Sequence, residues 1–351
     1  MQVRLATYAD REAWDDYVLN HSDGTAYQFF PWKDAIEKAY ALKSLYLLAE
    51  NSSGICGIFP LIDFRIPIIG RTFISLPYCD AGGILADNQN IEHVLIDHAC
   101  LMAQEMRAGI KIRSIRPLLP CGKNRTDKVS MILDLPNSSE TMLASYKSSL
   151  RSQIKKPLRD GLSVLVGKKE LLDDFYSVFT ENMRDLGSPV HARLWLEAVT
   201  SEYEDRVRVA VVYTPDKVPA AAGIVLLHPS RVSIPWASSL RRYNGINPNM
   251  LLYWTFLAFA ADNGYRQFDF GRSTPGEGTY RFKQQWGAKP QQLYWYEKDA
   301  SRSVGWHQLS IEPSHIDKQS SKRQLAVSLW QMLPQFGTDW LGPKIRKYIS
   351  L

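Results

Sequence analysis

The chain has 351 residues, of which 45% are hydrophobic and 11% aromatic, and its formal net charge is +6. A chain of this length favours two domains of roughly 150 residues each. The apolar content is high enough to form a substantial core, which argues against a disordered protein. The mild positive charge favours anionic partners such as phosphates, nucleic acid or an anionic membrane face, without deciding among them.

The cysteines and the apolar runs bear on the cellular compartment. The four cysteines lie about twenty residues apart with no C-x-x-C pair, and the first residues lack the apolar core of a signal peptide. The longest apolar runs, Ala220–Leu227 and Leu251–Ala261, are far shorter than the roughly 20 residues that cross a bilayer. We therefore expect a cytoplasmic protein without a membrane span.

Residues 1–136 form the predicted N-terminal domain. Apolar periodicity predicts, in chain order, helices over 10–19 and 31–40, strands over 45–50, 54–64 and 71–77, a helix capped by Asp87 or Asn88, and strands over 110–117 and 129–135. Because helices and strands alternate, the fold class is α/β (α+β), with a mixed sheet flanked by helices.

Residues 137–160 form the predicted connection. One helix is expected to run from Asn137 or Ser138 until Pro157 ends or kinks it. Lys147, Arg151 and Lys155 would then stack at intervals of four residues on one face. Like charges at this spacing repel, so the stripe indicates either a nearby anion or a solvated surface.

Residues 161–300 form the predicted C-terminal domain, which repeats the alternation. Strands are expected over 162–167, 206–213, 219–229 and 231–239, and helices over 170–186 and 192–203. A further helix begins at Pro248, with Asn247 as its cap and Gly264 beyond its end.

Residues 301–351 form the predicted basic and aromatic tail. A polar linker over 301–323 precedes a short amphipathic helix over 324–333 and an aromatic, basic segment over 340–351. Such a tail can rest on an anionic membrane surface, or it can dock on the domain.

Several enzyme signatures are absent from the sequence. There is no G-x-x-x-x-G-K-[ST], H-E-x-x-H or G-x-S-x-G pattern, and the seven histidines have no metal-ligand spacing. Hydrolase, NTPase and zinc-enzyme functions are therefore disfavoured, and no metal is expected.

A first candidate loop runs from Arg242 to Asn247, between a strand and the helix that begins at Pro248. A helix N-terminus after a glycine loop presents backbone N–H groups to a phosphate. Arg242, Asn244, Gly245 and Asn247 resemble the [QR]-x-x-G-x-[GA] pyrophosphate loop of GNAT acyltransferases, with Asn247 in place of the final small residue. The loop is either an anion site or a plain helix cap.

The second candidate, residues 265–296, organises the C-terminal half. It predicts a strand over Gln267–Phe270, a glycine-rich turn, a helix over Tyr280–Trp286 and a closing strand over Leu293–Tyr296. Alternation along the first strand places Asp269 opposite Phe268 and Phe270, so its carboxylate can point into a cleft.

Cations surround this carboxylate in the sequence. Arg272, Arg281 and Lys283 lie within fifteen residues of Asp269, and Tyr280 begins the helix between them. Acyl transfer to an amine needs a base or proton path, a donor to the developing oxyanion, and positive charge for a phosphate-bearing substrate. Alternatively, Asp269 is only a structural partner of Arg272 or Arg281.

The same stretch carries a family resemblance. Together with WASSLRRYNGINPNMLLYW, MRDLGSPV, LPYCDAGGILAD and WQMLPQFGTDWLGPK, it resembles the FemAB-related proteins that accompany exosortase/PEP-CTERM exopolysaccharide systems. The resemblance implies two tandem GNAT-like domains. Fem aminoacyltransferases join amino acids from aminoacyl-tRNA to the peptide of a lipid-linked peptidoglycan precursor.

The resemblance also implies roles for single residues. Lys283 matches the lysine of the Fem family's FK motif, which stabilises charge in the transfer. Arg184 and Asp185 lie in a helix that faces the acceptor in Fem proteins, and Lys33 lies near an acceptor-phosphate lysine. The helical hairpin that some Fem proteins insert for tRNA is missing, because Gly161–Glu170 is too short for it.

The expected function is therefore an N-acyltransferase that moves an acyl or aminoacyl group to an amine of an exopolysaccharide or peptidoglycan precursor. Lys283, Asp269 and Tyr280 are the expected catalytic residues, and acyl-CoA or aminoacyl-tRNA is the expected donor. The alternatives are a tRNA-dependent Fem-type aminoacyltransferase and a non-catalytic protein that binds a polysaccharide or lipid carrier. Peripheral contact with an anionic inner membrane face is a further expectation.

Overall fold

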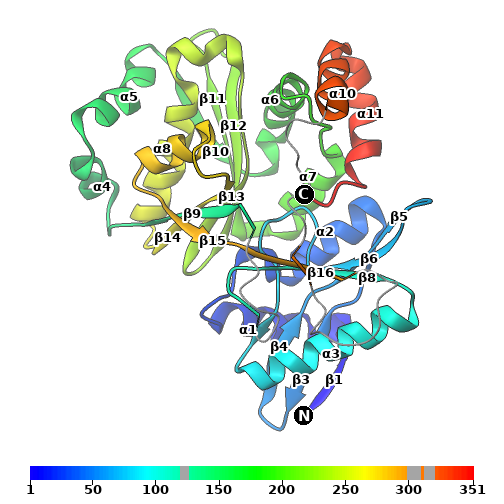
Figure 1. The fold of residues 1–351 in the computed structure, drawn as a ribbon. Helices are drawn as coiled ribbons and strands as arrows, with labels where there is room; N and C mark the ends of the chain where they lie inside the picture. The colour runs from blue at the N-terminus through cyan, green and yellow to red at the C-terminus, as the bar shows by residue number, and fades with distance from the viewer. Residues whose placement is uncertain (119–125, 299–309, 312–320) are drawn as a thin grey trace.

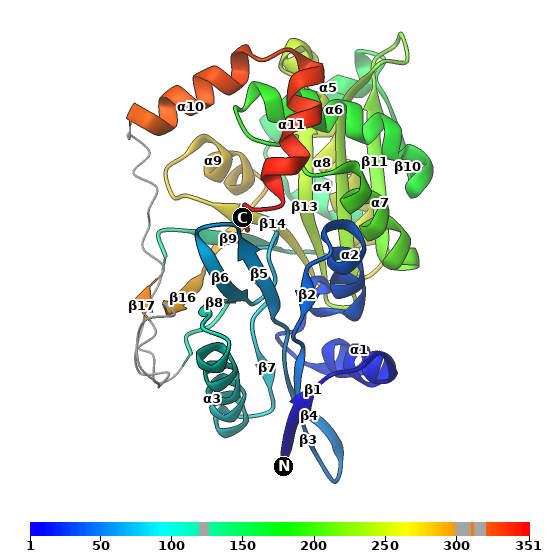
Figure 2. The same cartoon turned by 90° about the vertical axis from the view of Figure 1, so that its right-hand side faces the viewer.

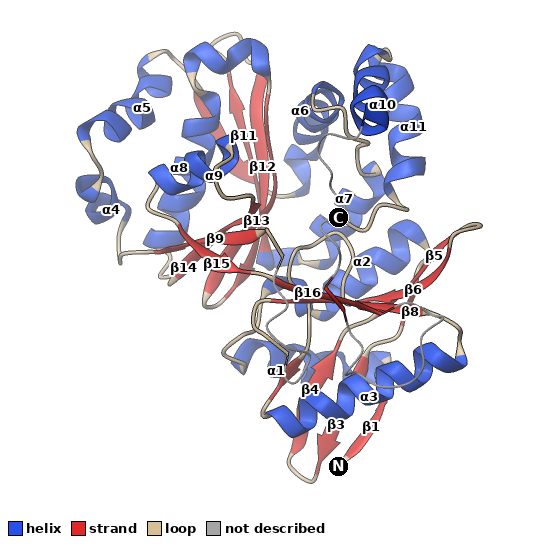
Figure 3. Ribbon diagram, viewed as in Figure 1, coloured by secondary structure: helices blue, strands red, loops and turns tan. Residues whose placement is uncertain are grey.

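The computed structural model describes residues 1–118, 126–298, 310–311 and 321–351. Within these residues the strands form three sheets with helices against them, as Figures 1 and 3 show. The predicted mixed α/β class is confirmed. Most of the polar linker predicted over 301–323 lies outside the described residues.

The N-terminal half contains two sheets. The four-stranded sheet has the order β1 (Gln2–Leu5), β3 (Leu47–Asn51), β4 (Gly54–Phe59) and β7 (Leu85–Ala86). The six-stranded sheet has the order β17 (Ser310–Ile311), β16 (Tyr294–Lys298), β8 (Gly109–Ser114), β6 (Gly70–Ile74), β5 (Ile62–Ile66) and β2 (Lys43–Ser44). The helices of this half are α1 (Arg11–Asn20), α2 (Phe30–Tyr40) and α3 (Gln89–Glu105).

The single strand predicted over 54–64 is wrong, because β4 and β5 are separate strands in different sheets. Pro60 lies between them, and proline has no N–H to continue a ladder. The predicted cap of α3 is confirmed at Asn88, whose side chain accepts a hydrogen bond from the Ile91 N–H at 3.1 Å.

The C-terminal half is built on a seven-stranded sheet. Its order is β10 (Ser163–Gly167), β11 (Val207–Tyr213), β12 (Pro219–His228), β13 (Arg231–Ser239), β14 (Gln267–Ser273), β9 (Val129–Asp134) and β15 (Lys289–Gln292). Helices α6 (Leu172–Asp185) and α7 (Arg193–Glu202) and helix α8 (Pro248–Asp262) pack against it. Alternation along β11 sends Val209 and Val211 into one core cluster, and Ala210 and Val212 into the other, with α8.

The connecting helix differs from its prediction. The chain breaks at Tyr146 and Lys147 into α4 (Ser139–Ser145) and α5 (Ser148–Arg159). Lys147 has extended backbone, and the Arg151 guanidinium turns back to the carbonyl of Tyr146. The predicted stripe of Lys147, Arg151 and Lys155 on one helix face therefore does not form. Pro157 lies buried inside α5 instead of ending it.

The two halves exchange strands. β9, which precedes the boundary predicted at residue 136, pairs with β14 and β15 in the C-terminal sheet. The chain then leaves β15 at Gln292 and enters β16 at Tyr294, which pairs with β8 in the N-terminal half. A continuous segment therefore belongs to both sheets.

A shared core also joins the halves. Trp32 of α2 is fully buried, and its ring centroid lies 5.0 Å from that of Trp195 on α7 and 6.2 Å from that of Trp236 on β13. The largest hydrophobic cluster accordingly contains residues from both halves. Separate folding of the two halves would expose these aromatic rings to water.

The tail lies against the C-terminal half. Helix α10 (Ser321–Met332) packs Val327 against Gly187, and the Gln331 amide donates to the Asp185 carbonyl at 2.8 Å. Helix α11 (Gln335–Arg346) places Gly342 against Val190. Figure 1 shows both helices beside α6, and Figure 2 shows the chain end near the centre of the molecule. The tail therefore docks on the domain through one side of each helix.

Trp32→Ala tests the shared core. We expect it to lower the free energy of unfolding by about 3 to 5 kcal/mol, because it leaves a cavity where the halves meet. Urea denaturation followed by circular dichroism measures this loss. The matched control, Trp340→Ala, alters a side chain that is 66% exposed, and its effect should stay within about 0.5 kcal/mol. Equal losses in both variants would contradict a shared core.

Candidate active site

The site begins where two parallel strands separate. β13 and β14 pair at only three positions, Arg231 with Gln267, Val232 with Phe268 and Ser233 with Asp269. Both strands continue beyond this point, β13 to Ser239 and β14 to Ser273. The sheet therefore opens into a wedge whose backbone groups are not engaged between these two strands, and such groups can bind a ligand.

A bulge in β14 lies at the mouth of the wedge. The register with β9 shifts between Asp269 and Arg272, and Gly271 has a φ of 72°, which favours glycine. The Asp269 carboxylate accepts hydrogen bonds from the Gly271 N–H at 2.8 Å and from the Ser130 hydroxyl at 2.6 Å. Asp269 thus holds the bulge that redirects Arg272.

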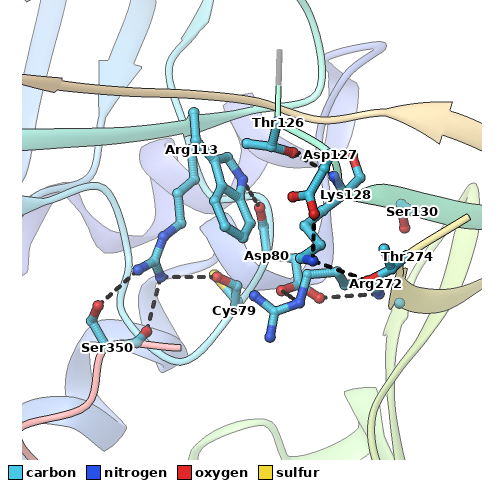
Figure 4. Close-up of polar contacts among 12 residues, drawn as sticks. Cys79, Asp80, Arg113, Thr126, Asp127, Lys128, Ser130, Arg272, Thr274 and Ser350 are labelled. Atoms are coloured by element: carbon cyan, nitrogen blue, oxygen red, sulfur yellow. Dashed lines mark hydrogen bonds and ion pairs between the residues drawn. The ribbon is translucent and has the colours of Figure 1, made fainter. Parts of the chain in front are cut away.

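Arg272 meets a carboxylate from the other half of the chain. Its backbone N–H lies 3.2 Å from Asp80 Oδ2, and its Nε lies 3.4 Å from Asp80 Oδ1. The indole of Trp295 donates to the Asp80 carbonyl at 3.1 Å, and the Arg272 guanidinium lies over the same indole ring. Figure 4 shows Asp80 and Arg272 pointing toward each other between the two halves.

The turn that carries Asp80 has unusual backbone geometry. Leu76 and Tyr78 have φ values of 60° and 69°, which bulky residues rarely adopt. The Arg113 guanidinium, itself fully buried, donates to the carbonyls of Leu76 and Cys79 at 3.2 and 3.1 Å. The Tyr78 hydroxyl donates to the Lys347 carbonyl at 2.8 Å. Strained backbone held by several bonds is typical of functional sites.

A cavity of about 260 Å³ lies beside this turn, between β13, α6 and the chain end. Aromatic rings form much of its wall, from Tyr27, Tyr78, Phe179, His191 and Trp236. Asp80, Arg272 and Arg346 supply its charged side chains. Aromatic walls with a few placed charges are typical of small-molecule sites.

The cavity is electropositive. The pKa of Arg346 is lowered to about 10, chiefly by burial; Tyr40 and Tyr78 oppose the shift, and the nearby guanidinium groups of Arg272 and Arg113 add to it. Cations that repel one another around a cavity favour an anionic ligand, which would relieve the repulsion.

Two polar aromatic residues face the same space. Burial raises the pKa of Tyr27 well above its ordinary value, with Asp269 and Asp80 adding to the shift, so its hydroxyl stays protonated. Burial also lowers the pKa of His191 well below its ordinary value, so the ring is neutral at pH 7. His191 Nδ1 lies 2.9 Å from the Tyr40 hydroxyl, which fixes the orientation of the imidazole.

Lys283, on α9 (Gly278–Gln285), braces the bulge from behind. Its ammonium donates to the carbonyls of Gly271 and Arg272 at 3.0 and 2.8 Å. The side chain is 8% exposed, and burial lowers its pKa to about 8, although Asp80 and Asp269 raise it in part. Lys283 therefore places a titratable cation directly beneath the mouth of the wedge.

The structure brings together some predicted site residues and separates others. Asp269, Arg272 and Lys283 lie around one bulge, as described above. Arg281 on the same helix is exposed, and Tyr280 packs partly against the core cluster that contains α8. In the described part of the chain, Asp269 forms no ion pair with Arg272 or Arg281. The alternative that Asp269 is a structural partner of one of these arginines is therefore wrong, and Arg272 pairs with Asp80 instead.

Two other predicted cations lie away from the cavity lining. Lys33 is ion-paired with Glu37 at 2.9 Å on α2. Arg184, near the end of α6, is ion-paired with its neighbour Asp185 at 3.1 Å. Its helix contributes Asn182, Met183 and Leu186 to the cavity instead.

The loop from Arg242 to Asn247 forms a 3₁₀ helix over Arg241–Ile246 before α8. The Arg242 guanidinium pairs with Glu181, and the Gly245 carbonyl accepts from the Lys156 ammonium at 3.0 Å. Asn247 stands at the N-cap of α8 with a φ of 54°, and its side chain makes no capping bond. The predicted cap position is confirmed, but the side chain does not perform the capping.

Sequence reasoning missed Asp80, Tyr27, His191 and Arg346. Asp80 was visible as a turn residue in LPYCDAGG, but turn chemistry alone does not distinguish a site from a connection. Tyr27 reaches the cavity from the short 3₁₀ helix before α2, His191 from the connection between α6 and α7, and Arg346 from the end of α11. Such convergence depends on tertiary packing, which local patterns do not reveal.

Comparison with known proteins matches this geometry. Residues 144–284 match the family described as "Acetyltransferase (GNAT) domain". These residues form a GNAT domain, and they include β13, β14, the bulge and Lys283. No curated protein matches the chain.

Solved structures extend the likeness to the whole fold. FemX is 14% identical, with 85% of this chain and 97% of that chain covered and a TM-score of 0.66. L-PGS from Bacillus licheniformis is 14% identical, with 84% and 93% covered and a TM-score of 0.54. A tandem GNAT protein from the clavulanic acid biosynthesis pathway is 12% identical, with 86% and 100% covered and a TM-score of 0.53. The predicted fold of two tandem GNAT-like domains is confirmed.

In the described residues, the histidine, cysteine, aspartate and glutamate side chains form no group of three that could hold a metal ion. No helix among these residues is both long and apolar enough to span a bilayer.

Lys283→Met tests the electrostatics of the GNAT domain. The folded-state pKa of Lys283 is about 8 against 10.5 in the unfolded chain, so between these values the unfolded chain binds more protons. Its contribution to stability therefore rises with pH over this interval. From about pH 8 to about pH 10, wild type should gain about 2 kcal/mol relative to the variant.

Urea unfolding at several pH values measures this difference. Lys289→Met, at an exposed lysine on β15, is the matched control and should show no such trend. A difference between wild type and Lys283→Met that stays constant with pH would rule out the lowered pKa.

Proposed function

We propose that this GNAT protein is an N-acyltransferase that moves an acyl or aminoacyl group onto an amine of a phosphate-bearing cell-envelope precursor. The observation that carries the proposal is the cavity at the end of the β13–β14 wedge, where the side chains of Arg272 and Arg346 accompany one carboxylate side chain, that of Asp80. The arginines suit a phosphate of the acceptor, and the aromatic wall suits the organic group that the phosphate carries.

The transfer needs a path for the donor's carbonyl. In the proposal, the carbonyl lies in the wedge between β13 and β14, where unengaged backbone N–H groups can bind its oxygen. The acceptor amine attacks the carbonyl carbon, and the tetrahedral intermediate expels the thiolate of CoA or the ribose oxygen of tRNA. Charge that develops on the oxygen is stabilised by the nearby Lys283 ammonium, whose third N–H is not used by the Gly271 and Arg272 carbonyls.

The amine must lose a proton during the attack. Asp80 lines the cavity, so we assign it the role of proton acceptor, directly or through water. Asp269 is engaged with Gly271 and Ser130 and acts by positioning the bulge. The protonated hydroxyl of Tyr27 can donate to the acceptor in the same space.

The remaining predicted residues have outer roles in the proposal. Tyr280 and Arg281 lie in the first turn of α9 and are assigned to the distal part of the donor. Arg242, Asn244, Gly245 and Asn247 stand before α8, where a helix N-terminus favours the donor's phosphates. Lys33 and Arg184 have no part, because each is ion-paired away from the cavity.

The donor distinguishes the two enzyme functions. Gly161–Glu170 consists of β10 and the start of a 3₁₀ turn, with no room for a long tRNA-binding hairpin. This supports acyl-CoA as donor, with aminoacyl-tRNA as the second candidate that the likeness to FemX favours. We further propose that the protein works at the cytoplasmic face of the inner membrane, where lipid-linked precursors reside.

Asp80→Asn and Lys283→Ala test the assigned chemistry. Each should lower kcat/KM of acyl transfer to an amine acceptor by about 100-fold, because each removes a group that acts on the transferred proton or the developing charge. Steady-state kinetics measures the loss, and circular dichroism confirms folding. Asp127→Asn and Lys289→Ala serve as charge-matched controls. Full activity in either site variant would remove that residue from the mechanism.

Donor binding at several salt concentrations separates the alternatives. A tRNA that contacts several cations should lose affinity steeply as salt rises, whereas acyl-CoA, which has few phosphates, should lose much less. Isothermal titration with each donor measures both slopes. If the protein binds a phosphorylated carrier but turns over no donor, it is a non-catalytic carrier-binding protein and not an enzyme.

A further inference from the structure

An apolar patch surrounds the bend between α10 and α11. We name it the elbow patch and define it by six side chains, Leu325, Leu329, Met332, Leu333, Phe336 and Trp340. Their exposed fractions are 60%, 56%, 80%, 37%, 78% and 66%. Single exposed apolar residues are ordinary on protein surfaces, whereas six of them within sixteen residues, on two adjoining helices, indicate a contact surface.

The patch is the outer side of two docked helices. Leu325, Leu329 and Met332 follow one another at four and three residues, which is one face of α10. Val327 and Gln331, on the opposite face, contact α6. On α11, Phe336 and Trp340 lie one turn apart, while Thr338 and Gly342 are buried. Both helices are therefore held to the protein by one side and expose an apolar side.

A lysine borders the patch. The Lys344 ammonium lies 3.3 Å from the centroid of the Trp340 ring. Residues 321–351 contain five lysines and arginines and one acidic residue, Asp339. Leucine, phenylalanine and tryptophan beside lysine are typical of segments that lie in the interface of an anionic bilayer.

The charge also bears on what covers the patch. Two copies of the chain joined at the elbow would bring two cationic segments together, which costs electrostatic energy. An anionic lipid surface has the complementary charge and accepts the apolar side chains without a matching groove.

We infer that the elbow patch is a docking surface for an anionic lipid bilayer. In Figures 1 and 2 the bend between α10 and α11 lies at the end of the molecule opposite the N-terminus, so a flat surface can reach it. Phe336 and Trp340 enter the interface, and lysines meet the lipid phosphates.

The docking surface connects directly to the cavity. α11 runs from the patch to Arg346, which lines the cavity. Beyond α11, the Ser350 carbonyl accepts hydrogen bonds from the Tyr78 N–H at 2.7 Å and from the Arg113 guanidinium at 2.9 Å. Tyr78 and Arg113 hold the turn of Asp80. A protein docked by the elbow would thus receive an acceptor from the membrane beside its own cavity, a consequence that rests on the proposed function.

Vesicle sedimentation with the full chain tests the inference. Wild type should pellet with vesicles of phosphatidylcholine containing about one third phosphatidylglycerol, and much less with phosphatidylcholine alone. Raising salt from about 0.1 M to about 0.5 M should weaken the binding. Phe336→Ser/Trp340→Ser should bind about tenfold more weakly, and Lys344→Glu should lose binding to the anionic vesicles.

The matched control is Leu101→Ser/Leu158→Ser, at leucines that are 51% and 54% exposed on α3 and α5. It should bind like wild type. Equal binding by both double variants, or no binding of wild type to anionic vesicles, would overturn the inference. So would a concentration-dependent dimer in light scattering that Phe336→Ser/Trp340→Ser abolishes, since the patch would then join two copies.

Activity separates this result from the proposed function. Phe336→Ser/Trp340→Ser should keep wild-type turnover of a water-soluble acceptor, because neither residue lines the cavity. Vesicle binding without turnover would contradict the proposed acyltransferase function and support the docking surface. Turnover without vesicle binding would support the proposed function and contradict the docking surface.

Discussion

The contact between Asp80 and Arg272 is the interaction on which the site depends. Each residue comes from a different half of the chain, and each is placed by unusual backbone: a turn with two non-glycine residues at positive φ, and a strand bulge at Gly271. Arg113 braces the turn and Lys283 braces the bulge, in both cases by donating to carbonyls. Cationic side chains therefore serve as supports as well as ligand-binding groups.

This arrangement explains why the positive charge is tolerated in a buried place. Backbone carbonyls accept hydrogen bonds from the Arg113 guanidinium and from the Lys283 ammonium, which offsets part of the cost of burying these two charges. Asp80 and Asp269 are carboxylates near the wedge that partly oppose the lowering of the Lys283 pKa. In the proposed function, cations held in place before the ligand arrives lower the cost of reorganisation when an anion binds.

Much of the fold could be predicted from periodicity, because long helices such as α3 and α8 and apolar strands such as β12 carry strong local patterns. The break of the helix at Tyr146 could not be predicted. Arg151 donates to the carbonyls of Ala144 and Tyr146, and these carbonyls are available only once the turn between α4 and α5 has formed. Asp269, Arg272 and Lys283 were recognisable because they are close in sequence. Asp80 and Arg346 lie some 190 and 70 residues from Arg272, and only the exchange of strands and the docked tail bring them there.

The segment that runs from β15 into β16 has a mechanical consequence. Gln292, before Leu293, pairs with β9, and Tyr294, after it, pairs with β8. The two halves are therefore joined by one continuous backbone segment as well as by a shared core. A hinge-like opening at Leu293 would leave both ladders intact, because each lies within one half. It would instead separate Trp32 from Trp195 and Trp236 and expose these rings to water, so the shared core is what opposes such an opening.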